Sequence, residues 1–593
     1  MVYIPLPMAH RLATRLIRTI QPSQNNLLIV LSVMVGLATG FGAMAFTALI
    51  EYFNELFFGL TDQILVTAVG FADWGGYKWW LPIIPMLGGL LVGPIVYKFA
   101  SEARGHGVPE VMNAVARLGG IIRSRVAAAK AVASAICIGS GGSAGREGPI
   151  VQIGSAIGSV IGQIFRMGGN RVKVLVGCGA AAGISAVFNA PIAGVIFSLE
   201  VILGDFGIRT FAPVILSSVV ASVVTRTFIG NSPAFEVPAY SLVSAWEIPM
   251  YAIMGVLLGA LSVSFTRILD WTEDAFEKIK MTNWLKPAVG GLLLGVLAIF
   301  YPQVLADGYK TIRLTLHGDL AITLLLILVA AKMLATCMTL GSGNSGGIFA
   351  PSLFMGAVAG GSFGYVAHKL FPSATATPGA YALVGMAGMV AGATHAPITA
   401  LLIIYEMTLD YRIILPLMVT VVFSVLIARW LYGESIYTIK LAKRGIEIRG
   451  GKDLSVLRAH TVSEVMETEF ETVRAYSTVA EIFRKVEAST DSYFIVVDSD
   501  DHLKGVLSFQ DLRNLLSEHS LDNWVIAQDL IGPYTVTLQT TDDLQIAQQQ
   551  FSQRDYQLIP VVEPGNPFRV VGIVRREALI DYYNKSLLDT LRQ

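Results

Sequence analysis

The stretch GSGGSAGREGP, residues 139–149, decides the fold of its region, because this glycine-rich loop ends in proline directly before the apolar run 150–165. Proline is tolerated in the first turn of a helix, where its missing N–H costs no hydrogen bond. We therefore expect a helix whose first backbone amides are free, and such amides attract anions. Small residues also let membrane helices pack closely, which is the simpler interpretation of Gly154 and Gly158.

The same loop recurs in the second half of the chain. Residues 341–351 read GSGNSGGIFAP, in which Gly347 and Pro351 repeat Gly145 and Pro149 at a distance of 202 residues. A second pair of motifs recurs at a distance of 206 residues: Ala190-Pro191-Ile192 with Glu200, and Ala396-Pro397-Ile398 with Glu406. Two matched pairs in one order predict two related halves with a site between them.

Composition indicates that much of the chain lies in lipid. Of the 593 residues, 53% are hydrophobic and only 15% are charged, and the mean hydropathy is +0.60. About 20 apolar residues are needed to cross the hydrocarbon core. The stretches 150–165 and 348–365 are shorter and contain glycine or proline, which predicts broken helices beside a pathway. The other apolar stretches are residues 81–97, 174–203, 211–224, 249–265, 320–340, 381–404 and 413–431.

Charge and cysteine content exclude several classes of function. The 43 basic and 43 acidic side chains leave no net charge to attract nucleic acid. Cys137, Cys178 and Cys337 show neither metal-ligand nor paired spacing, so we expect buried cysteines, no metal site and no redox chemistry. The sequence has no P-loop lysine motif, no zinc-type histidine pair and no nucleophile elbow, and we do not expect an enzyme.

The N-terminal region is basic and lacks the pattern of a removable signal peptide. Arg11, Arg15 and Arg18 precede the first long apolar stretch, residues 27–50. Basic residues beside a first span favour a cytoplasmic N-terminus, although an interfacial amphipathic helix explains the same arginines.

Four separate segments carry a resemblance to a known family: GHGVP at residues 105–109, GREGP at 145–149, GGIFAP at 346–351, and Tyr437. In order and spacing they resemble the anion-pathway segments of the CLC family of chloride channels and proton/chloride antiporters. The resemblance implies an all-α polytopic membrane domain with two inverted repeats of broken helices. It also implies a homodimer with one pore in each subunit. The implied domain covers residues 1–445, with repeats at about 27–230 and 245–440.

The resemblance further implies roles for single residues. Glu147 corresponds to the gate, a carboxylate that takes the place of an anion when charged and moves away when protonated or displaced. Without the other motifs, helix capping explains an acidic residue in a first turn equally well. Lys130 and Arg146 resemble cations that raise the potential of the pathway, and a wet surface is the alternative position for either. The implied anion-binding residues are His106, Gly107, Arg146, Gly148, Ile348, Phe349 and Tyr437.

One departure from the family pattern concerns selectivity. The family has a serine that faces the central anion where this chain has His106. An imidazole N–H donates to chloride as well, and protonation at mildly acid pH adds a positive charge. In the alternative, the ring turns away and only the backbone lines the site.

A second departure concerns protons. Val201 stands where family antiporters generally carry a glutamate, and family channels have valine there. Valine cannot transfer a proton. We therefore predict a channel that conducts chloride passively, and a proton/chloride antiporter that uses Glu147 without the inner glutamate is the alternative. Glu200 and its counterpart Glu406 are expected to hold helices together.

The residues after about 459 form a tandem repeat of another kind. A strand, a turn, a strand and a helix occur at 493–497, 498–501, 503–507 and after 508, and again at 558–562, 563–567, 569–574 and beyond. This pattern resembles a soluble α/β pair of CBS domains. The resemblance places them at residues 459–517 and 525–587, after a linker at 446–458.

CBS pairs often bind adenine nucleotides through a serine or threonine and an aspartate three residues later. Ser508 and Asp511 fit this pattern in the first domain, whereas the second domain has Arg575 and Ala578 there. At most one such site is expected, and a plain helix N-cap is the favoured interpretation of Ser508.

The expected partners are chloride or similar anions, the lipid bilayer and a second copy of the chain. No cofactor is required, chloride is the bound ion, and an adenine nucleotide is a candidate ligand of the CBS pair. We expect a multi-pass protein of the cell inner (plasma) membrane with its N-terminus and CBS tail in the cytoplasm. A CBS-regulated divalent-cation transporter is a rival class, but its pore would be lined by acidic residues.

Overall fold

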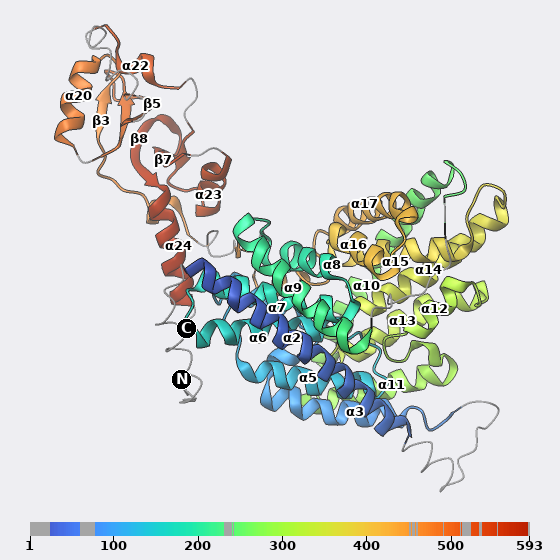
Figure 1. The fold of residues 1–593 in the computed structure, drawn as a ribbon. Helices are drawn as coiled ribbons and strands as arrows, with labels where there is room; N and C mark the ends of the chain where they lie inside the picture. The colour runs from blue at the N-terminus through green and yellow to red at the C-terminus, as the bar shows by residue number, and fades with distance from the viewer. Residues whose placement is uncertain are drawn as a thin grey trace. The chain divides into compact units, whose positions relative to one another are not determined.

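The computed structural model describes residues 24–59, 78–230, 240, 242–446, 448–449, 452–453, 457, 460–489, 491–509, 512, 524–532, 536–553 and 556–590. The chain divides into two compact units, Met1–Lys452 and Asp453–Gln593. Within the described residues the first unit is built mainly from helices, and the second contains small mixed sheets (Figure 1).

The first unit consists of two successive series of helices, each with eight α-helices among the described residues. The first series is α2 (Gln24–Asn54), α3 (Ile83–Pro94), α4 (Val108–Ala116), α5 (Ser124–Gly139), α6 (Glu147–Ile164), α7 (Gly169–Phe188), α8 (Pro191–Phe197) and α9 (Ile208–Ile229). The second is α10 (Glu247–Lys278), α11 (Lys286–Phe300), α12 (Tyr309–His317), α13 (Ile322–Gly341), α14 (Phe349–Leu370), α15 (Pro378–Thr394), α16 (Pro397–Thr408) and α17 (Ile414–Leu431). A short helix, α18 (Ile439–Lys443), follows.

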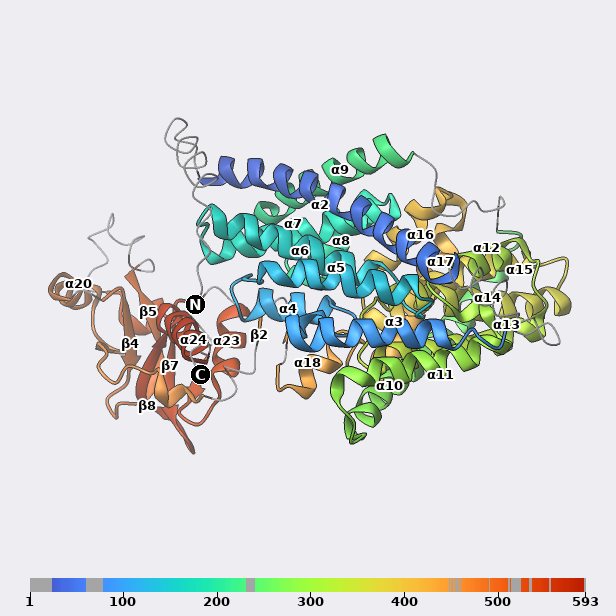
Figure 2. The ribbon, with the colours of Figure 1, turned by 90° about the horizontal axis from the view of Figure 1, so that it is seen from below.

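Equivalent helices pack in the same way in the two series. α2 packs on α9 as α10 packs on α17, and α6 packs on α7 as α14 packs on α15. Between the series, α3 contacts α11 and α8 contacts α16. The blue-to-green first series and the green-to-orange second series lie side by side (Figures 1 and 2). The predicted pair of related helical halves is confirmed.

Eight helical segments in the described part of the first unit are long and apolar enough to cross a membrane. Outward-facing apolar side chains such as Val223, Leu257 and Leu426 are more than half exposed. Exposed apolar faces of this extent suit a lipid environment rather than water. The segments are Asn26–Gly59, Gly169–Phe188, Thr210–Ile229, Glu247–Lys278, Asn283–Phe300, Ile322–Gly341, Phe349–Leu370 and Tyr411–Leu431.

The expectation of broken helices at 150–165 and 348–365 is wrong. α6 and α14 are continuous over 18 and 22 residues. Their glycines serve close packing, since a Cβ on Gly158 would lie 2.0 Å from the carbonyl oxygen of Leu175. Small residues of this kind bring membrane helices together without interrupting them.

The interruptions lie before the two Ala-Pro-Ile motifs instead. Asn189 and His395 adopt left-handed conformations, with φ of 56° and 57°, and end α7 and α15. Pro191 and Pro397 then begin α8 and α16. Because proline disfavours the helical region for the residue before it, each long apolar stretch forms two helices rather than one.

The second unit contains two copies of a three-stranded sheet. In the first copy, β3 (Thr472–Arg474) is parallel to β4 (Tyr493–Val497), which is antiparallel to β5 (Leu503–Ser508). In the second copy, β6 (Leu538–Gln539), β7 (Leu558–Glu563) and β8 (Asn566–Arg575) repeat this arrangement. The α-helices described in this unit are α20 (Val479–Ala488), α22 (Ala527–Leu530), α23 (Leu544–Gln553) and α24 (Arg576–Thr590). Two short paired strands, β1 (Ile448–Arg449) and β2 (Lys452–Asp453), lie at the boundary between the units.

The predicted strands of the tail are confirmed, with boundaries that differ by one residue at most except at the start of β8. β8 begins at Asn566 rather than at Arg569. The reason is a tight turn, in which Gly565 with φ of +89° lets Glu563 pair with Asn566. The helix predicted after β8 is α24, whereas most of the segment predicted as a helix after Ser508 lies outside the described residues.

Candidate functional site

Three of the glycine-rich loops singled out in the sequence meet at one point of the first unit. The Gly105 amide donates to the carbonyl of Asn344 at 3.1 Å, and the Gly346 amide donates to the carbonyl of Gly105 at 3.3 Å. Gly145 and Gly347 exchange two hydrogen bonds, with N–O distances of 2.8 and 2.6 Å. The loops before α4, α6 and α14 are therefore joined to one another by backbone contacts.

Glycine is required where these loops touch. A Cβ on Gly148 would lie 2.4 Å from the carbonyl oxygen of His106, and one on Gly347 would lie 2.8 Å from the amide nitrogen of Gly148. Gly107, directly before α4, has φ of +83°. Three helix N-termini consequently converge, and their positive dipole ends suit an anion.

The Glu147 carboxylate lies at this convergence and is 1% exposed. Its Oε1 accepts a hydrogen bond from the hydroxyl of Tyr309 at 2.6 Å, and its Oε2 has no partner among the described residues. Gly145 lies close to Oε2 and to the start of α14. A Cβ added to Gly145 would lie 2.0 Å from Oε2 of Glu147 and 3.1 Å from the amide nitrogen of Ala350, so both atoms border the same small space. The carboxylate therefore lies beside the first amides of α14, where an anion would bind.

Arg146 lies near Tyr309 and Asp307, two residues that the sequence analysis did not connect with it. Its guanidinium lies over the ring of Tyr309, 5.3 Å from the centroid, and 3.9 Å from a carboxylate oxygen of Asp307. The Arg146 charge thus belongs to a cluster with Asp307 and Tyr309, beside the residue predicted to be the gate.

Lys130 has a counterpart in the second half. The buried Lys130 ammonium donates to the carbonyls of Ala103 and Gly105 at 3.1 and 2.6 Å. The buried Lys332 ammonium donates to the carbonyls of Val304 and Ala306 at 2.9 and 2.8 Å. Each lysine therefore holds the loop before a short helix, α4 or α12. Sequence reasoning missed Lys332, although the 202-residue repeat distance leads from Lys130 directly to it.

His106 and Tyr437 come together from opposite ends of the first unit. Both side chains are buried, at 3% and 2% exposure, and their ring centroids are 5.8 Å apart. The Nδ1 atom of His106 has no hydrogen-bond partner in the part of the chain that the structure describes. The imidazole therefore lies beside Tyr437, with a polar nitrogen that is available to a bound ion.

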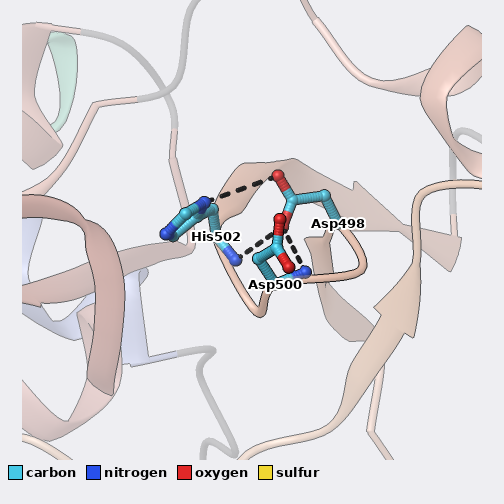
Figure 3. A group of neighbouring side chains, drawn as sticks. All are labelled: Asp498, Asp500 and His502. Carbon is cyan, nitrogen blue, oxygen red and sulfur yellow. Dashed lines mark hydrogen bonds and ion pairs between the residues drawn. The ribbon is translucent and has the colours of Figure 1, made fainter.

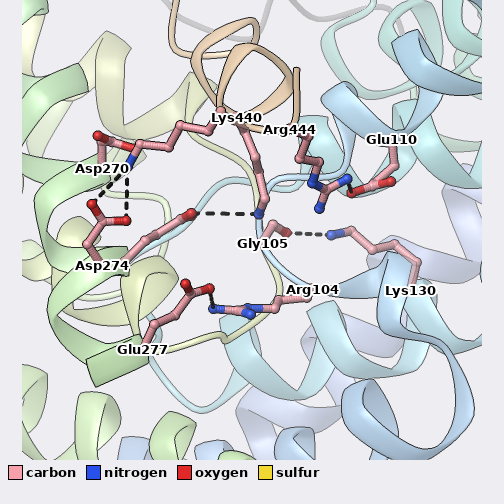
Figure 4. Close-up of polar contacts among 11 residues, drawn as sticks. Arg104, Gly105, Glu110, Lys130, Asp270, Asp274, Glu277, Lys440 and Arg444 are labelled. Atoms are coloured by element: carbon pink, nitrogen blue, oxygen red, sulfur yellow. Dashed lines mark hydrogen bonds and ion pairs between the residues drawn. The ribbon is translucent and has the colours of Figure 1, made fainter. Parts of the chain in front are cut away.

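Ion pairs surround the loop that carries His106 (Figure 4). Lys440 on α18 lies close to Gly105 and 3.7 Å from Glu273 on α10. The α10 carboxylates lie on one face of that helix and neutralise cations of the loop and of α18. The other pairs are Arg104 with Glu277 at 3.2 Å, Lys443 with Asp270 at 2.7 Å and Asp274 at 2.9 Å, and Arg444 with Glu110 at 3.0 Å.

The geometry of the first unit agrees with comparisons to known proteins. Residues 88–429, more than half of the chain, match the family described as voltage gated chloride channel. The chain belongs to the CLC family. Residues 462–518 and 527–585 match the CBS domain.

Relatives in the CLC family include channels by name and exchangers by name. The putative chloride channel protein ClcB-like of Ralstonia nicotianae is 34% identical over 69% of this chain and 96% of its own length. The H(+)/Cl(-) exchange transporter ClcA of Citrobacter koseri is 33% identical over 72% of this chain and 90% of its own. A slow cyanobacterial Cl-/H+ antiporter of known structure is 28% identical, with a TM-score of 0.64 over 70% of this chain and 97% of its own.

The position predicted to correspond to the antiporter glutamate is apolar. Val201 lies in a π-helical turn, η5 (Ser198–Leu203), and packs against the main hydrophobic core of the first unit. The neighbouring Glu200 accepts hydrogen bonds from the amides of Ile398 and Thr399. Glu200 thus makes the helix-holding contacts that were expected of it.

The two candidate nucleotide positions of the CBS pair differ. Ser508 ends β5, and Asp511 lies outside the described residues. In the second domain, the Arg575 guanidinium is 3.0 Å from Glu467 and 2.8 Å from Asp491. A cavity of about 970 Å³ beside Arg575 is lined mainly by residues 466–472 and is rich in carboxylates. Carboxylates repel phosphate, so this position suits a nucleotide poorly.

A turn of the first CBS domain brings three metal-ligand side chains together (Figure 3). Asp498 accepts hydrogen bonds from the amides of Asp500 and His502 at 3.0 and 2.9 Å, and the Lys504 ammonium lies 3.1 Å from it. The His502 amide contributes most to holding the pKa of Asp498 below its usual range. The carboxylate is therefore already used in closing the turn between β4 and β5.

Proposed function

We propose that this CLC protein passes chloride or similar anions through the point where α4, α6 and α14 begin, with Glu147 as the gate. The observation that carries this proposal is the position of the Glu147 carboxylate. It is buried, lies beside the first amides of α14, and has one oxygen without a partner among the described residues. A carboxylate at a helix N-terminus occupies the place where a chloride ion would be stabilised.

The groups around this position support anion binding. We propose that the backbone amides of Ile348 and Phe349, the Tyr437 hydroxyl and the His106 imidazole contact the central anion. Gly107, Gly148 and Arg146 contribute free amides or charge close by. Lys130 acts through the loop, because its ammonium is held by two carbonyls. The acids near this loop are paired with cations, which argues against a cation pathway.

We propose passive conduction as the mode of transport. Val201 is packed against the hydrophobic core, and Glu200 caps α16, so neither offers an evident inner proton acceptor. Proton/chloride exchange is the second candidate. Similarity to the Citrobacter koseri exchange transporter and to the cyanobacterial antiporter favours proton/chloride exchange.

The chloride reversal potential of protein-containing liposomes distinguishes the two modes. With a fixed chloride gradient and an imposed pH gradient, a passive channel gives the chloride Nernst potential at every pH. A reversal potential that moves with the pH gradient would contradict passive conduction and support exchange. Glu147→Ala liposomes test the gate itself, since removal of the carboxylate is expected to raise chloride flux and to remove its dependence on external pH.

The assembly and the tail complete the proposal. We propose a homodimer in the cell inner (plasma) membrane with both termini in the cytoplasm. The CBS pair, with limits at 459–517 and 525–587, regulates transport, and Ser508 and Asp511 form its single candidate adenine nucleotide site. Binding of ATP to the full-length protein, measured by calorimetry, tests this site against the Ser508→Ala variant.

A further inference from the structure

Tyr309 contacts the proposed gate from the second half of the chain. Its hydroxyl donates to Oε1 of Glu147 at 2.6 Å, across 162 residues of sequence. A hydroxyl that donates to a charged carboxylate at this distance makes one of the stronger hydrogen bonds in proteins. When the carboxylate is protonated, the same hydroxyl faces a neutral acid and the bond is weaker.

The structure holds Tyr309 firmly in this position. Tyr309 is the first residue of α12 and follows Gly308, whose φ is +79°. Lys332 holds the preceding loop through the carbonyls of Val304 and Ala306. This loop is the counterpart of the one that carries His106, but in the second half it presents a phenol to Glu147.

Arg146 strengthens the contact. Its guanidinium lies 5.3 Å from the centroid of the Tyr309 ring and 3.9 Å from Asp307. A positive charge over the ring polarises the phenol and improves its O–H as a donor. Arg146 therefore acts on the gate through Tyr309.

We propose that Tyr309 is a positioning residue of the gate, whose hydroxyl stabilises the charged Glu147 carboxylate in the anion site at the start of α14. This inference rests on the proposed role of Glu147 as the gate. An incoming anion must then displace the carboxylate from its place beside the α14 amides and break its bond with the Tyr309 hydroxyl. A proton that neutralises Glu147 weakens the bond and releases the side chain.

The test is chloride flux from liposomes that contain the full-length protein, measured against external pH. Tyr309→Phe keeps the ring beneath Arg146 and removes only the hydroxyl. We expect flux at neutral pH to rise about tenfold, and the pH of half-maximal flux to move upward by about one unit. Tyr365→Phe is the matched control, because the Tyr365 hydroxyl donates to the carbonyls of Gly318 and Leu320, and it should leave both values unchanged.

The same measurement in a Glu147→Ala background separates this inference from the gate itself. Tyr309→Phe should change nothing further once the carboxylate is absent. If Glu147→Ala raises flux but Tyr309→Phe does not, the role of Tyr309 is wrong and the gate stands. An equal effect of Tyr309→Phe in both backgrounds also overturns the role of Tyr309. If Glu147→Ala leaves flux and its pH dependence unchanged, both proposals fail.

Discussion

Glu200 and Glu406 each cap a helix in the other half of the molecule. Glu200 accepts hydrogen bonds from the Ile398 and Thr399 amides at 3.2 and 2.8 Å, at the start of α16. Glu406 accepts hydrogen bonds from the Ile192 and Ala193 amides at 3.0 and 2.7 Å, at the start of α8. This reciprocal capping is possible because the two glutamates follow equivalent prolines in related halves.

Glu200→Gln should therefore lower stability without changing transport mode. Loss of the charge weakens the hydrogen bonds to α16, and we expect a loss of about 1–3 kcal/mol in the free energy of unfolding. Thermal unfolding of the purified protein in detergent measures this loss, with the exposed Glu51→Gln as control. A reversal potential that changes its response to pH in Glu200→Gln would instead indicate a role in proton movement.

Lys332→Met should destabilise the second half more than a comparable lysine substitution elsewhere. The change leaves the carbonyls of Val304 and Ala306 buried without their donor, at a cost of about 2–4 kcal/mol. Lys286→Met is the control, because the buried Lys286 ammonium donates a longer hydrogen bond, 3.3 Å, to the Glu277 carbonyl. Equal melting temperatures for the two variants would contradict the role of Lys332 in holding the α12 loop.

Gly145→Ala should displace the Glu147 carboxylate from its position beside α14. The added Cβ would lie 2.0 Å from Oε2 of Glu147, so the carboxylate must leave its position beside α14. We expect a chloride flux at neutral pH that approaches that of Glu147→Ala. Gly168→Ala has open space around the new Cβ and serves as the control. Wild-type flux and pH dependence in Gly145→Ala would show that the carboxylate does not block the pathway from this position.

His106→Ser should change selectivity among anions. The imidazole lies beside Tyr437, and its replacement removes a large side chain whose Nδ1 has no hydrogen-bond partner among the described residues. We expect the order of permeability across a series of halides and nitrate to change. Reversal potentials under bi-ionic conditions measure this order. An unchanged order would mean that only the backbone of this loop contacts the anion.

The folded structure at the start of the first CBS domain should lose stability in acid. The Thr461 amide, the Tyr582 hydroxyl and the His460 ring, in that order, lower the pKa of Glu464 to about 2 from its usual value of 4.5. A lowered pKa stabilises the folded state at pH values above 4.5, and this contribution is lost as the pH falls from 4.5 toward 2.

Hydrogen exchange of the full-length protein around residues 460–466 tests this dependence. Exchange in Glu464→Gln should exceed that of the wild type at pH 6, and the difference should shrink below pH 4.5 and vanish at about pH 2. A difference that is constant across this pH range would show that the carboxylate charge does not matter there.

Local signals in the sequence predicted where helices and strands lie better than they predicted where the membrane helices are interrupted. Apolar length identified the membrane helices, and Gly565 and its neighbours marked the turn before β8. Glycine in α6 and α14 was misleading, because in lipid it serves packing rather than interruption. The actual breaks lie at Asn189 and His395, which the proline two residues later could have indicated.

The sequence by itself determined the membrane class, the two related halves, the CBS pair and the candidate gate Glu147. The membrane class and the two halves follow from composition and repeat spacing, whereas the CBS pair and the candidate gate follow from the resemblance of short motifs to known families. Only the tertiary structure decided that Tyr309 contacts the candidate gate Glu147, that Asp307 lies near Arg146, and that Lys332 holds their loop. Lys332 contacts a loop of its own half, and only its repeat distance from Lys130 marks it in the sequence. The contacts of Glu147 with Tyr309 and of Arg146 with Asp307 join residues from opposite halves, and such pairs leave no periodic or local pattern in the chain. Their geometry depends on how the two halves pack, which the order of residues alone does not reveal.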